Sequence, residues 1–531
     1  MSTLTDTKPE VAWEDVALSF FPPAKRTRRA TERLRAYRLP LILIMQAALT
    51  WRLNDIINDD EALYIHGGHV VIAHLLHGGS GNAALLNLYG TYFSGAPNAY
   101  PVVAAALDSV GGLVLARLFS LFCMLVASVC VYKIGKHLFT ENVGLFASLI
   151  FALAGSVQFM GKLATYDAPC LALIALASMV AITRQSISSG AIIGFFLALA
   201  PVTKYAGLAL VPFVLVMTFV VALTAEGRPW RRHFWQATLR GSVALLVCLG
   251  LLLIGYRLWG SGIAVGVKFT TTGRHALQPE STSILVKSLI YDIGLTYALA
   301  VTGILLMLRR RVWDRAVLMA VMLCAGSVIQ ASSLRIHEFV SLDKHTAFTA
   351  LFCAVPAAVA LEWARSKRGR AILAVAVVSW LLLIDGMWRS SVQYSWPSSI
   401  MGPIRQIENL NVSGQYFSFD ADAGTYYTQE DQGIVWYSTA QAYSIFGQGL
   451  PKVVAMEKSH EFTGFLFQTT NLSGQNLSEL HSLQQLLASD HYYFKTSTFL
   501  VSPYAKAVWQ LWIHYPNGYN SPSLKASSNG P

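Results

Sequence analysis

Apolar stretches recur along the whole chain and constrain its fold more than any other feature. They lie near 39–53, 111–132, 143–160, 168–183, 190–202, 205–224, 242–259, 290–308, 316–332, 346–361 and 371–388. Only 13% of the residues are charged, against about 25% in average proteins. A straight membrane span needs roughly 20 apolar residues, and several stretches are shorter, so their ends are approximate. The sequence predicts a polytopic α-helical membrane protein with about 11 transmembrane helices.

Basic residues are confined to short runs between these stretches. Lys25 to Arg38 directly precedes the first stretch, and further basic runs occur at 133–136, 184, 228–232, 309–311 and 365–370. With eleven spans, all of these runs fall on one side of the membrane, and cytoplasmic loops are the ones enriched in Lys and Arg. The net charge of +11 therefore reflects membrane topology and not nucleic-acid binding. We expect a multi-pass plasma (inner) membrane protein whose residues 1–38 form a basic cytoplasmic N-terminal segment.

The number of spans around Pro201 and Tyr205 determines on which side of the membrane all later loops lie. The apolar stretch from Ala191 to Leu223 is too long for one span and just long enough for two short ones. If it were one helix, the later arginine-rich loops would face outward, against the positive-inside bias. We therefore expect two spans here, with Lys204 between them.

The domain organisation follows from where the composition changes. Residues 39–388 form the predicted transmembrane catalytic domain, with a long first outer loop at 54–110 in which 69–77 is predicted to lie along the membrane interface. Residues 389–531 contain alternating aromatic and polar segments, which predict a small extracytoplasmic α/β domain. The six cysteines all lie in or beside apolar segments and are interpreted as packing residues.

Three consecutive acids in the first outer loop are the main catalytic candidates. Asp59, Asp60 and Glu61 follow the first span, where ionisable groups have little structural use. A carboxylate can take the proton of an acceptor hydroxyl as it attacks a sugar, and adjacent acids tend to raise one another's pKa. We assign Asp60 and Glu61 to catalysis and Asp59 to a helix cap. The alternative is a solvated loop end in which these acids cap the next helix.

Asp167 is the acid of the second outer loop. It precedes Pro169, so helix capping alone could explain it. It would nevertheless lie at the same membrane depth as Asp60. Two carboxylates facing one cleft could divide the roles of accepting a proton and positioning the acceptor or a metal.

Basic side chains on the same face would suit a phosphate. Lys204 lies between two apolar stretches, where a cation is costly unless it is paired or reaches water. Arg335 and His337 occur in one outer loop, and Lys344 and His345 follow. Departure of a sugar leaves negative charge on phosphate oxygens, which fixed cations stabilise. All five are therefore substrate-binding candidates, and the alternatives are snorkelling of Lys204 and ion pairs within the loop.

Four histidines in the first outer loop raise the question of a metal. His66, His69, His74 and His77 have helical spacing, but no acid joins them at the spacing of a zinc motif. We interpret them as interface residues and predict no metal ligands. No cofactor is certain, and a divalent metal ion stays open as an alternative.

Three short motifs resemble the GT-C superfamily of membrane glycosyltransferases. They are Asp60-Glu61-Ala62-Leu63-Tyr64, Tyr166-Asp167-Ala168-Pro169 and Thr203-Lys204. Residues 38–390 are most similar to protein O-mannosyltransferase-like and aminoarabinose-transferase-like enzymes, that is, glycosyltransferase family 39 and its bacterial relatives. Tyr64 and Tyr166 belong to these motifs and are added to the substrate-binding candidates. The C-terminal domain resembles no acceptor-recognition module, and the extra acid, Asp59, precedes the family's acid pair.

The resemblance implies an inverting transferase that uses a sugar on a polyprenyl-phosphate carrier. Asp60 would be the base and Asp167 the second acid, while Lys204 and the segment of Lys344 and His345 would approach the carrier phosphate. Its partners would be the polyprenyl-phosphate sugar donor, the bilayer, and a glycan, lipid or protein acceptor of the cell envelope. The alternative is a transporter or flippase of lipid-linked or polar solutes, which predicts charges near the midplane and inverted repeats.

Overall fold

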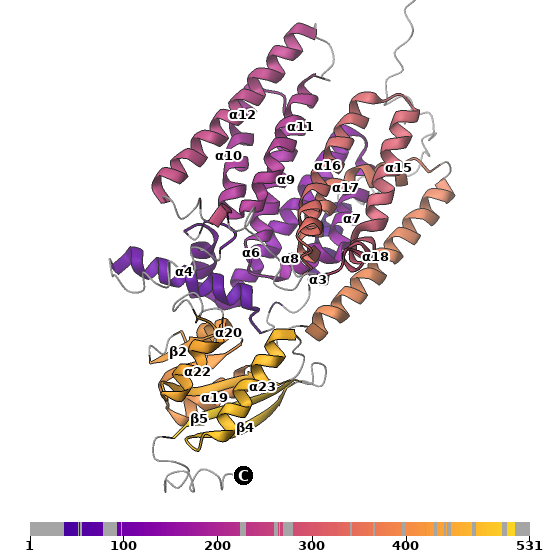
Figure 1. The fold of residues 1–531 in the computed structure, drawn as a ribbon. Helices are drawn as coiled ribbons and strands as arrows, with labels where there is room; N and C mark the ends of the chain where they lie inside the picture. The colour runs from indigo at the N-terminus through magenta and orange to yellow at the C-terminus, as the bar shows by residue number, and fades with distance from the viewer. Residues whose placement is uncertain are drawn as a thin grey trace, which may run out of the picture.

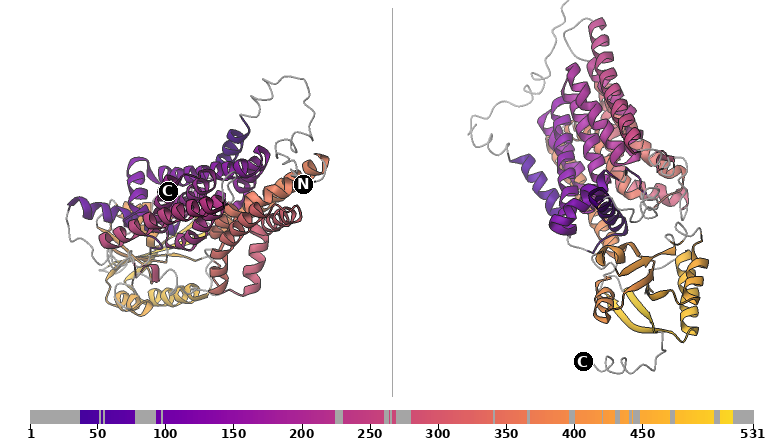
Figure 2. Two further views of the ribbon diagram at one scale, coloured as in Figure 1. Left: turned by 90° about the horizontal axis from the view of Figure 1, so that it is seen from above. Right: turned by 90° about the vertical axis from the view of Figure 1, so that its left-hand side faces the viewer.

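A helical bundle with a smaller strand-containing domain at one end makes up the protein (Figure 1). The computed structural model describes residues 37–515 except 51–52, 54–55, 78–92, 97, 224–229, 260–263, 265, 269–279, 340–341, 365–366, 396–399, 420, 430–432, 440–441, 443–447, 470–473 and 502–506. The expected cytoplasmic segment 1–38 therefore lies almost wholly outside the described residues. We call the end of the bundle against the C-terminal domain the near end, and the opposite one the far end (Figures 1 and 2).

The bundle is built from apolar helices joined by short polar connections. Its elements are α3 (Arg38–Leu49), α4 (Asp59–His77), α6 (Tyr100–Leu138), α7 (Glu141–Leu153), α8 (Gly155–Lys162), α9 (Asp167–Thr183), α10 (Ile187–Thr203), the 3-10 helix η1 (Tyr205–Leu210), α11 (Val211–Leu223), α12 (Trp230–Trp259), α14 (Thr282–Leu289), the π-helical turn η2 (Ile290–Gly294), α15 (Leu295–Arg309), α16 (Trp313–Arg335), α17 (Leu342–Glu362) and α18 (Lys367–Ser395). The expectation of a polytopic helical protein is confirmed.

Helix length separates the eleven predicted spans into two groups. Within the described residues, seven helices are long and apolar enough to cross a membrane, or eight if α7 and α8 count as one span. The other three predicted stretches form the shorter apolar helices α3, α9 and α10. The count of eleven spans therefore stays a prediction. The predicted span 143–160 is divided into α7 and α8, which meet at 63° where Ala154 is extended.

Two backbone breaks place the ends of helices near the predicted functional residues. Lys204 is extended, with φ −144° and ψ 121°, and separates α10 from η1 and α11, as expected from the sequence. In α6, Gly112 has φ 64°, a conformation that costs little only for glycine, so the helix bends there. Residues 100–110 of the first outer loop are thus helical and continue into the span expected from residue 111.

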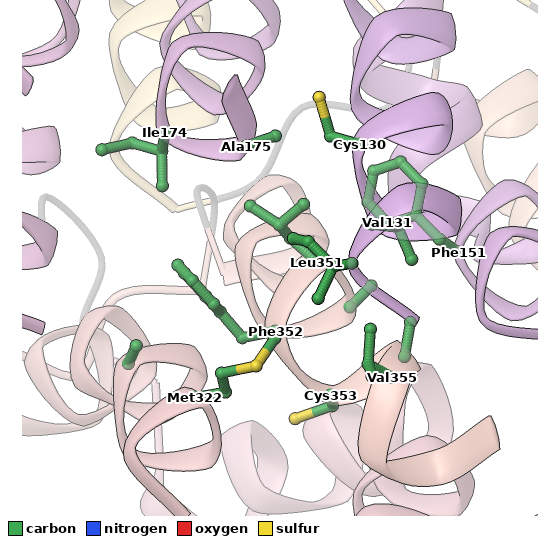
Figure 3. Close-up of a cluster of buried hydrophobic side chains, with 14 of the residues drawn as sticks. Cys130, Val131, Phe151, Ile174, Ala175, Met322, Leu351, Phe352, Cys353 and Val355 are labelled. Carbon is green, nitrogen blue, oxygen red and sulfur yellow. The ribbon is translucent and has the colours of Figure 1, made fainter. Parts of the chain in front are cut away.

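Helix α17 lies at the centre of the bundle. Its apolar window is 94% buried, whereas the windows of the peripheral helices α12 and α18 are each 22% buried. Leu351, Phe352 and Val355 of α17 pack with side chains from α6, α7, α9 and α16 in the main apolar core (Figure 3). Five cysteines are buried as the packing interpretation predicts, whereas Cys324 is exposed on α16. The central position of α17 holds its first turn, which carries Lys344 and His345, against the surrounding helices.

The C-terminal domain is a five-stranded mixed sheet with helices, in agreement with the predicted small α/β domain. Its elements are α19 (Met401–Leu410), β1 (Gly414–Ser418), α20 (Ala421–Tyr427), β2 (Ile434–Tyr437), α22 (Leu450–Lys458), β3 (Phe462–Gln468), α23 (Gly474–Ser489), β4 (Tyr493–Val501) and β5 (Ala507–His514). The strand order is β2-β1-β3-β5-β4, in which β1 is parallel to both neighbours and β5 is antiparallel to both. Helix α20 packs against α4 and joins the domain to the near end.

Candidate functional site

The start of α4 is fixed by a reciprocal cap. The backbone N–H of Asp60 donates to the side-chain oxygen of Asn58 at 3.2 Å, and the N–H of Asn58 donates to Glu61 at 2.9 Å. This is a capping box, in which two otherwise unpaired backbone donors are satisfied. The expectation that Asp59 caps this helix is therefore wrong, because Asn58 is the cap and Asp59 is the first helical residue.

Glu61 is buried in an ion pair that the sequence did not lead us to expect. The Arg117 guanidinium donates to both of its carboxylate oxygens, at 2.8 and 2.6 Å, and both side chains are 0% exposed. The backbone N–H of Ala164 donates to the same carboxylate at 2.6 Å. Glu61 thus joins α4, α6 and the loop before α9. This geometry favours a positioning role over the catalytic role expected for it.

The sequence position of Arg117, within an apolar stretch, could have indicated the buried ion pair. An arginine within an apolar span is costly unless it has a partner, and such residues mark functional or structural centres. Arg117 also donates to the carbonyl oxygens of Leu53 and Ile56 at 2.9 and 3.0 Å. It therefore holds the chain segment that leads into α4, and with it the orientation of Asp60.

Asp60 pairs with Lys344 at the start of α17. The lysine Nζ lies 2.5 Å from Asp60 Oδ2. The Asp60 side chain is 31% exposed and that of Lys344 is 16% exposed, so this pair is open to solvent on one side.

Asp167 forms a second, more deeply buried acid–lysine pair. Its carboxylate accepts from Lys204 Nζ, and the two side chains are 3% and 7% exposed. His345 Nε2 lies 3.1 Å from the same Nζ. Asp167 is the first residue of α9, and the N-cap position belongs to Tyr166. The capping explanation for Asp167 is therefore wrong, and its carboxylate binds Lys204 instead.

These two pairs belong to one cluster, which we call the near-end cluster: Asp60, Asp167, Lys204, Lys344 and His345. Lys344 interacts electrostatically with both Asp60 and Asp167, so the pairs are adjacent. The residues come from α4, α9, α10's end and α17, which are far apart in the sequence. Tertiary packing thus brings together acids and cations that the sequence placed only on a common membrane face.

Tyr64 and Tyr166 form the wall beside this cluster. The Tyr64 hydroxyl donates to that of Tyr166 at 2.6 Å, and the ring centroids are 4.5 Å apart. The Lys204 ammonium lies over the Tyr166 ring, 5.3 Å from its centroid, an arrangement that favours the cation. Both rings are buried, so these tyrosines support the cluster from within the fold.

A glycine allows the first outer loop to pack against the end of α10. A Cβ at Gly95 would lie 2.0 Å from the carbonyl oxygen of Thr203. The neighbouring N–H of Ala96 donates to Val202 O at 2.8 Å, and Tyr205 N–H donates to Ser94 O at 2.6 Å. The loop therefore fixes the backbone on both sides of Lys204.

Two of the candidate cations lie outside the near-end cluster. Arg335 is exposed at the end of α16, and His337 is exposed with its Nδ1 3.0 Å from the carbonyl oxygen of Glu280. Neither forms an ion pair with Asp60 or Asp167 among the described residues. Nor do those residues contain a group of three or more His, Cys, Asp or Glu side chains placed to hold a metal ion.

His69 of α4 contacts an acid of α6. His69 Nε2 lies 2.9 Å from Asp108 Oδ2 of α6, and the hydroxyl of Tyr426 in α20 donates to the other Asp108 oxygen at 2.7 Å. Burial lowers the pKa of His66 to about 4, and nearby His69 adds to the effect. The contact through Asp108 joins α4, α6 and the C-terminal domain beside the cluster.

Comparison with known proteins identifies the fold. The sequence pattern of the family described as Dolichyl-phosphate-mannose-protein mannosyltransferase matches residues 104–254. ArnT from Cupriavidus metallidurans, solved bound to undecaprenyl phosphate, superposes with a TM-score of 0.58 at 11% identity, over 91% of this chain and 98% of that one. This chain has the GT-C fold. The apo form of the same ArnT gives a TM-score of 0.55 at 13% identity, over 89% of this chain and 97% of that one.

The GT-C likeness extends beyond the membrane part. Coverage of 91% of the chain is more than residues 38–390 can supply, so at least part of the C-terminal domain has a structural counterpart in ArnT. The family pattern, in contrast, spans Asp167 and Lys204 but ends before Lys344 and begins after Asp60. No curated protein matches the chain in sequence.

Proposed function

We propose that the protein is an inverting membrane glycosyltransferase that moves a sugar from a polyprenyl-phosphate carrier to a cell-envelope acceptor on the outer face of the membrane. The observation that carries this proposal is the near-end cluster, in which the partly exposed Asp60 pairs with Lys344 and the buried Asp167 pairs with Lys204. The GT-C fold and the family pattern support it. The undecaprenyl phosphate in the ArnT structure is consistent with a polyprenyl-phosphate donor here.

Asp60 is the proposed general base. Its exposed carboxylate face can accept the proton of the acceptor hydroxyl while that oxygen attacks the anomeric carbon of the sugar. The new bond forms as the bond from the anomeric carbon to the phosphate oxygen breaks, and the electron pair leaves with the phosphate. One displacement of this kind inverts the anomeric configuration, as only one nucleophile acts.

Lys204 and Lys344 are the proposed contacts of the carrier phosphate. Negative charge grows on the phosphate oxygens as the sugar leaves, and fixed ammonium groups in a partly desolvated position stabilise it. Lys344 is bonded to Asp60. A bound phosphate would compete for this lysine and weaken its hold on Asp60, so that the base becomes free only when the donor is in place.

Asp167 and His345 are proposed to position Lys204. Asp167 is almost fully buried and its carboxylate is engaged by the ammonium. The ion pair therefore holds Lys204 at the place where the phosphate is proposed to bind.

The outer-face assignment rests on the distribution of basic residues. The near end carries the cluster and the C-terminal domain, whereas the basic segments 309–311 and 367–370 lie at the far end. Because positive loops stay in the cytoplasm, we propose that the near end faces outward.

Transfer by the purified full-length protein tests the proposed base. In proteoliposomes supplied with polyprenyl-phosphate sugars and cell-envelope acceptors, we expect Asp60→Asn to lower the transfer rate by about 10²–10⁴-fold, with donor affinity close to that of the wild type. Asp59→Asn, which changes the neighbouring helix residue in the same way, should leave transfer within about twofold. Full transfer by Asp60→Asn would disprove the role of Asp60. Movement of the lipid-linked sugar across the bilayer without transfer would instead support the flippase alternative.

A further inference from the structure

A cavity of about 890 Å³ lies at the far end of the bundle, away from the near-end cluster. Its walls include Lys133, Lys136, Arg184, Ser186 and Ser188. We call it the far-end cavity. Helix α9 begins at Asp167 of the cluster, and Arg184 of the cavity directly follows its last residue. The helix has 17 residues and is therefore about 25 Å long at 1.5 Å per residue. The cavity and the cluster thus lie on opposite sides of the bundle.

The walls of the far-end cavity are positively charged and lack a counter-ion. Lys133, Lys136 and Arg184 are exposed and none lies within ion-pair distance of a carboxylate in the part of the chain that the structure describes. No Asp or Glu lines the cavity. Lys136 donates only to a neutral group, the hydroxyl of Tyr132, at 3.3 Å.

A fourth cation lies directly behind this wall. Arg240 of α12 is 0% exposed and donates to Ser189 Oγ at 3.0 Å, and Ser189 lines the cavity. Its other partners are the carbonyl oxygens of Val180, Ala181 and Thr218. These partners are dipoles, so the charge of Arg240 is not cancelled and adds to the positive potential of the cavity.

Hydrogen-bond donors complete the site. The hydroxyls of Ser186 and Ser188 line the cavity, and α10 begins there at Ile187, so its first backbone N–H groups and the positive end of its dipole face this end. Phosphate is the anion that suits three cations and several donors at a helix start. The basic residues could also be explained by the helix dipoles, since cations are stabilised at the C-terminal ends of α6 and α9. The dipoles do not explain why a cavity lies between these basic residues.

We propose that the far-end cavity binds a phosphate-bearing ligand, either the headgroup of an anionic phospholipid or a soluble phosphate compound. The lipid source is favoured by the apolar rim. Ile192 lines the cavity with 48% exposure, and Phe195 on the next turn of α10 is 46% exposed, so an acyl chain could continue along α10. Basic pockets between helices on the cytoplasmic side bind such headgroups. The proposal does not depend on the transferase activity.

Calorimetric titration of the delipidated full-length protein in neutral detergent tests the site. The probes are short-chain phosphatidylglycerol, short-chain phosphatidylcholine and inorganic pyrophosphate. We expect phosphatidylglycerol to bind at least about tenfold more tightly than phosphatidylcholine, and a variant with Lys133→Gln, Lys136→Gln and Arg184→Gln to lose at least about tenfold in affinity. Saturable pyrophosphate binding with no preference among the lipids would assign the site to a soluble phosphate compound.

A second triple variant controls for loss of charge. Arg309→Gln, Arg311→Gln and Arg368→Gln remove three exposed cations from the same end of the bundle but outside the cavity. We expect this control to retain wild-type affinity within about twofold. Equal losses in both variants, or no saturable binding of either anionic probe to the wild type, would overturn the proposal. Far-UV circular dichroism and size-exclusion profiles would show that both variants are folded.

Discussion

The near and far ends of the bundle differ in whether their basic side chains are paired with carboxylates. At the near end, Lys204 and Lys344 are each bonded to a carboxylate. At the far end, Lys133, Lys136 and Arg184 face a cavity without one. Burial explains the difference, because a desolvated cation needs a partner, whereas an exposed one is stabilised by water. The paired lysines are held in place by their carboxylates, whereas the far-end cations face a cavity.

The largest expected effect comes from breaking the buried pair at the near end. Lys204→Met leaves the Asp167 carboxylate desolvated and without its main partner, so we expect a loss of about 3–5 kcal/mol in the free energy of unfolding. Lys136→Met at the far end, where the side chain is exposed, should change it by less than about 0.5 kcal/mol. Unfolding by SDS titration in mixed micelles measures both.

A double variant separates charge from packing in this experiment. Lys204→Met combined with Asp167→Leu removes both charges, and we expect it to recover much of the lost stability. Similar small losses for Lys204→Met and Lys136→Met would show that burial does not distinguish the two ends.

Glu457 in the C-terminal domain extends the comparison to a buried acid that forms no ion pair among the described residues. Its side chain is 1% exposed, and neither carboxylate oxygen has a hydrogen-bond partner among the described residues. Burial raises its pKa to about 7, and the charge of Asp490 adds to the rise. The unfolded chain then releases this proton at lower pH than the folded one, so stability falls as the pH rises from about 4.5 to about 7.

Replacement by glutamine removes this pH dependence. At pH 8 we expect Glu457→Gln to stabilise the domain by up to about 3 kcal/mol, and at pH 4 to leave it unchanged, because both states are then protonated. Hydrogen exchange of the β3 amides at several pH values measures the effect. A gain that is the same at both pH values would contradict the assignment to Glu457 ionisation.

The smallest expected effect concerns the contact between the near end and the C-terminal domain. Tyr426→Phe removes the hydrogen bond to Asp108, which also faces His69. We expect a loss of about 1 kcal/mol, since the group is partly exposed. Limited proteolysis between α18 and α19 should become faster. Tyr437→Phe, in the same domain but on β2, is the control, and equal cleavage of both variants would argue against the Asp108 contact.

The sequence by itself determined the class of fold and the face on which the polar residues gather. Apolar length and basic loops are local properties, so the helices and the break at Lys204 could be predicted, as could Asp60, Asp167, Lys204, Lys344 and His345 as candidates. The bend between α7 and α8 was not predicted, because one extended residue in an apolar stretch leaves no compositional signal.

Only the tertiary structure decided which residues are partners. Glu61 and Asp60 are adjacent in the sequence, yet one is buried against Arg117 and the other faces Lys344. Asp167 could have capped its own helix but binds Lys204. These outcomes depend on how α4, α6, α9 and α17 pack, and ion pairs between distant segments carry no local sequence pattern. The far-end cavity has the same origin, since a hollow exists only between helices that have already been placed.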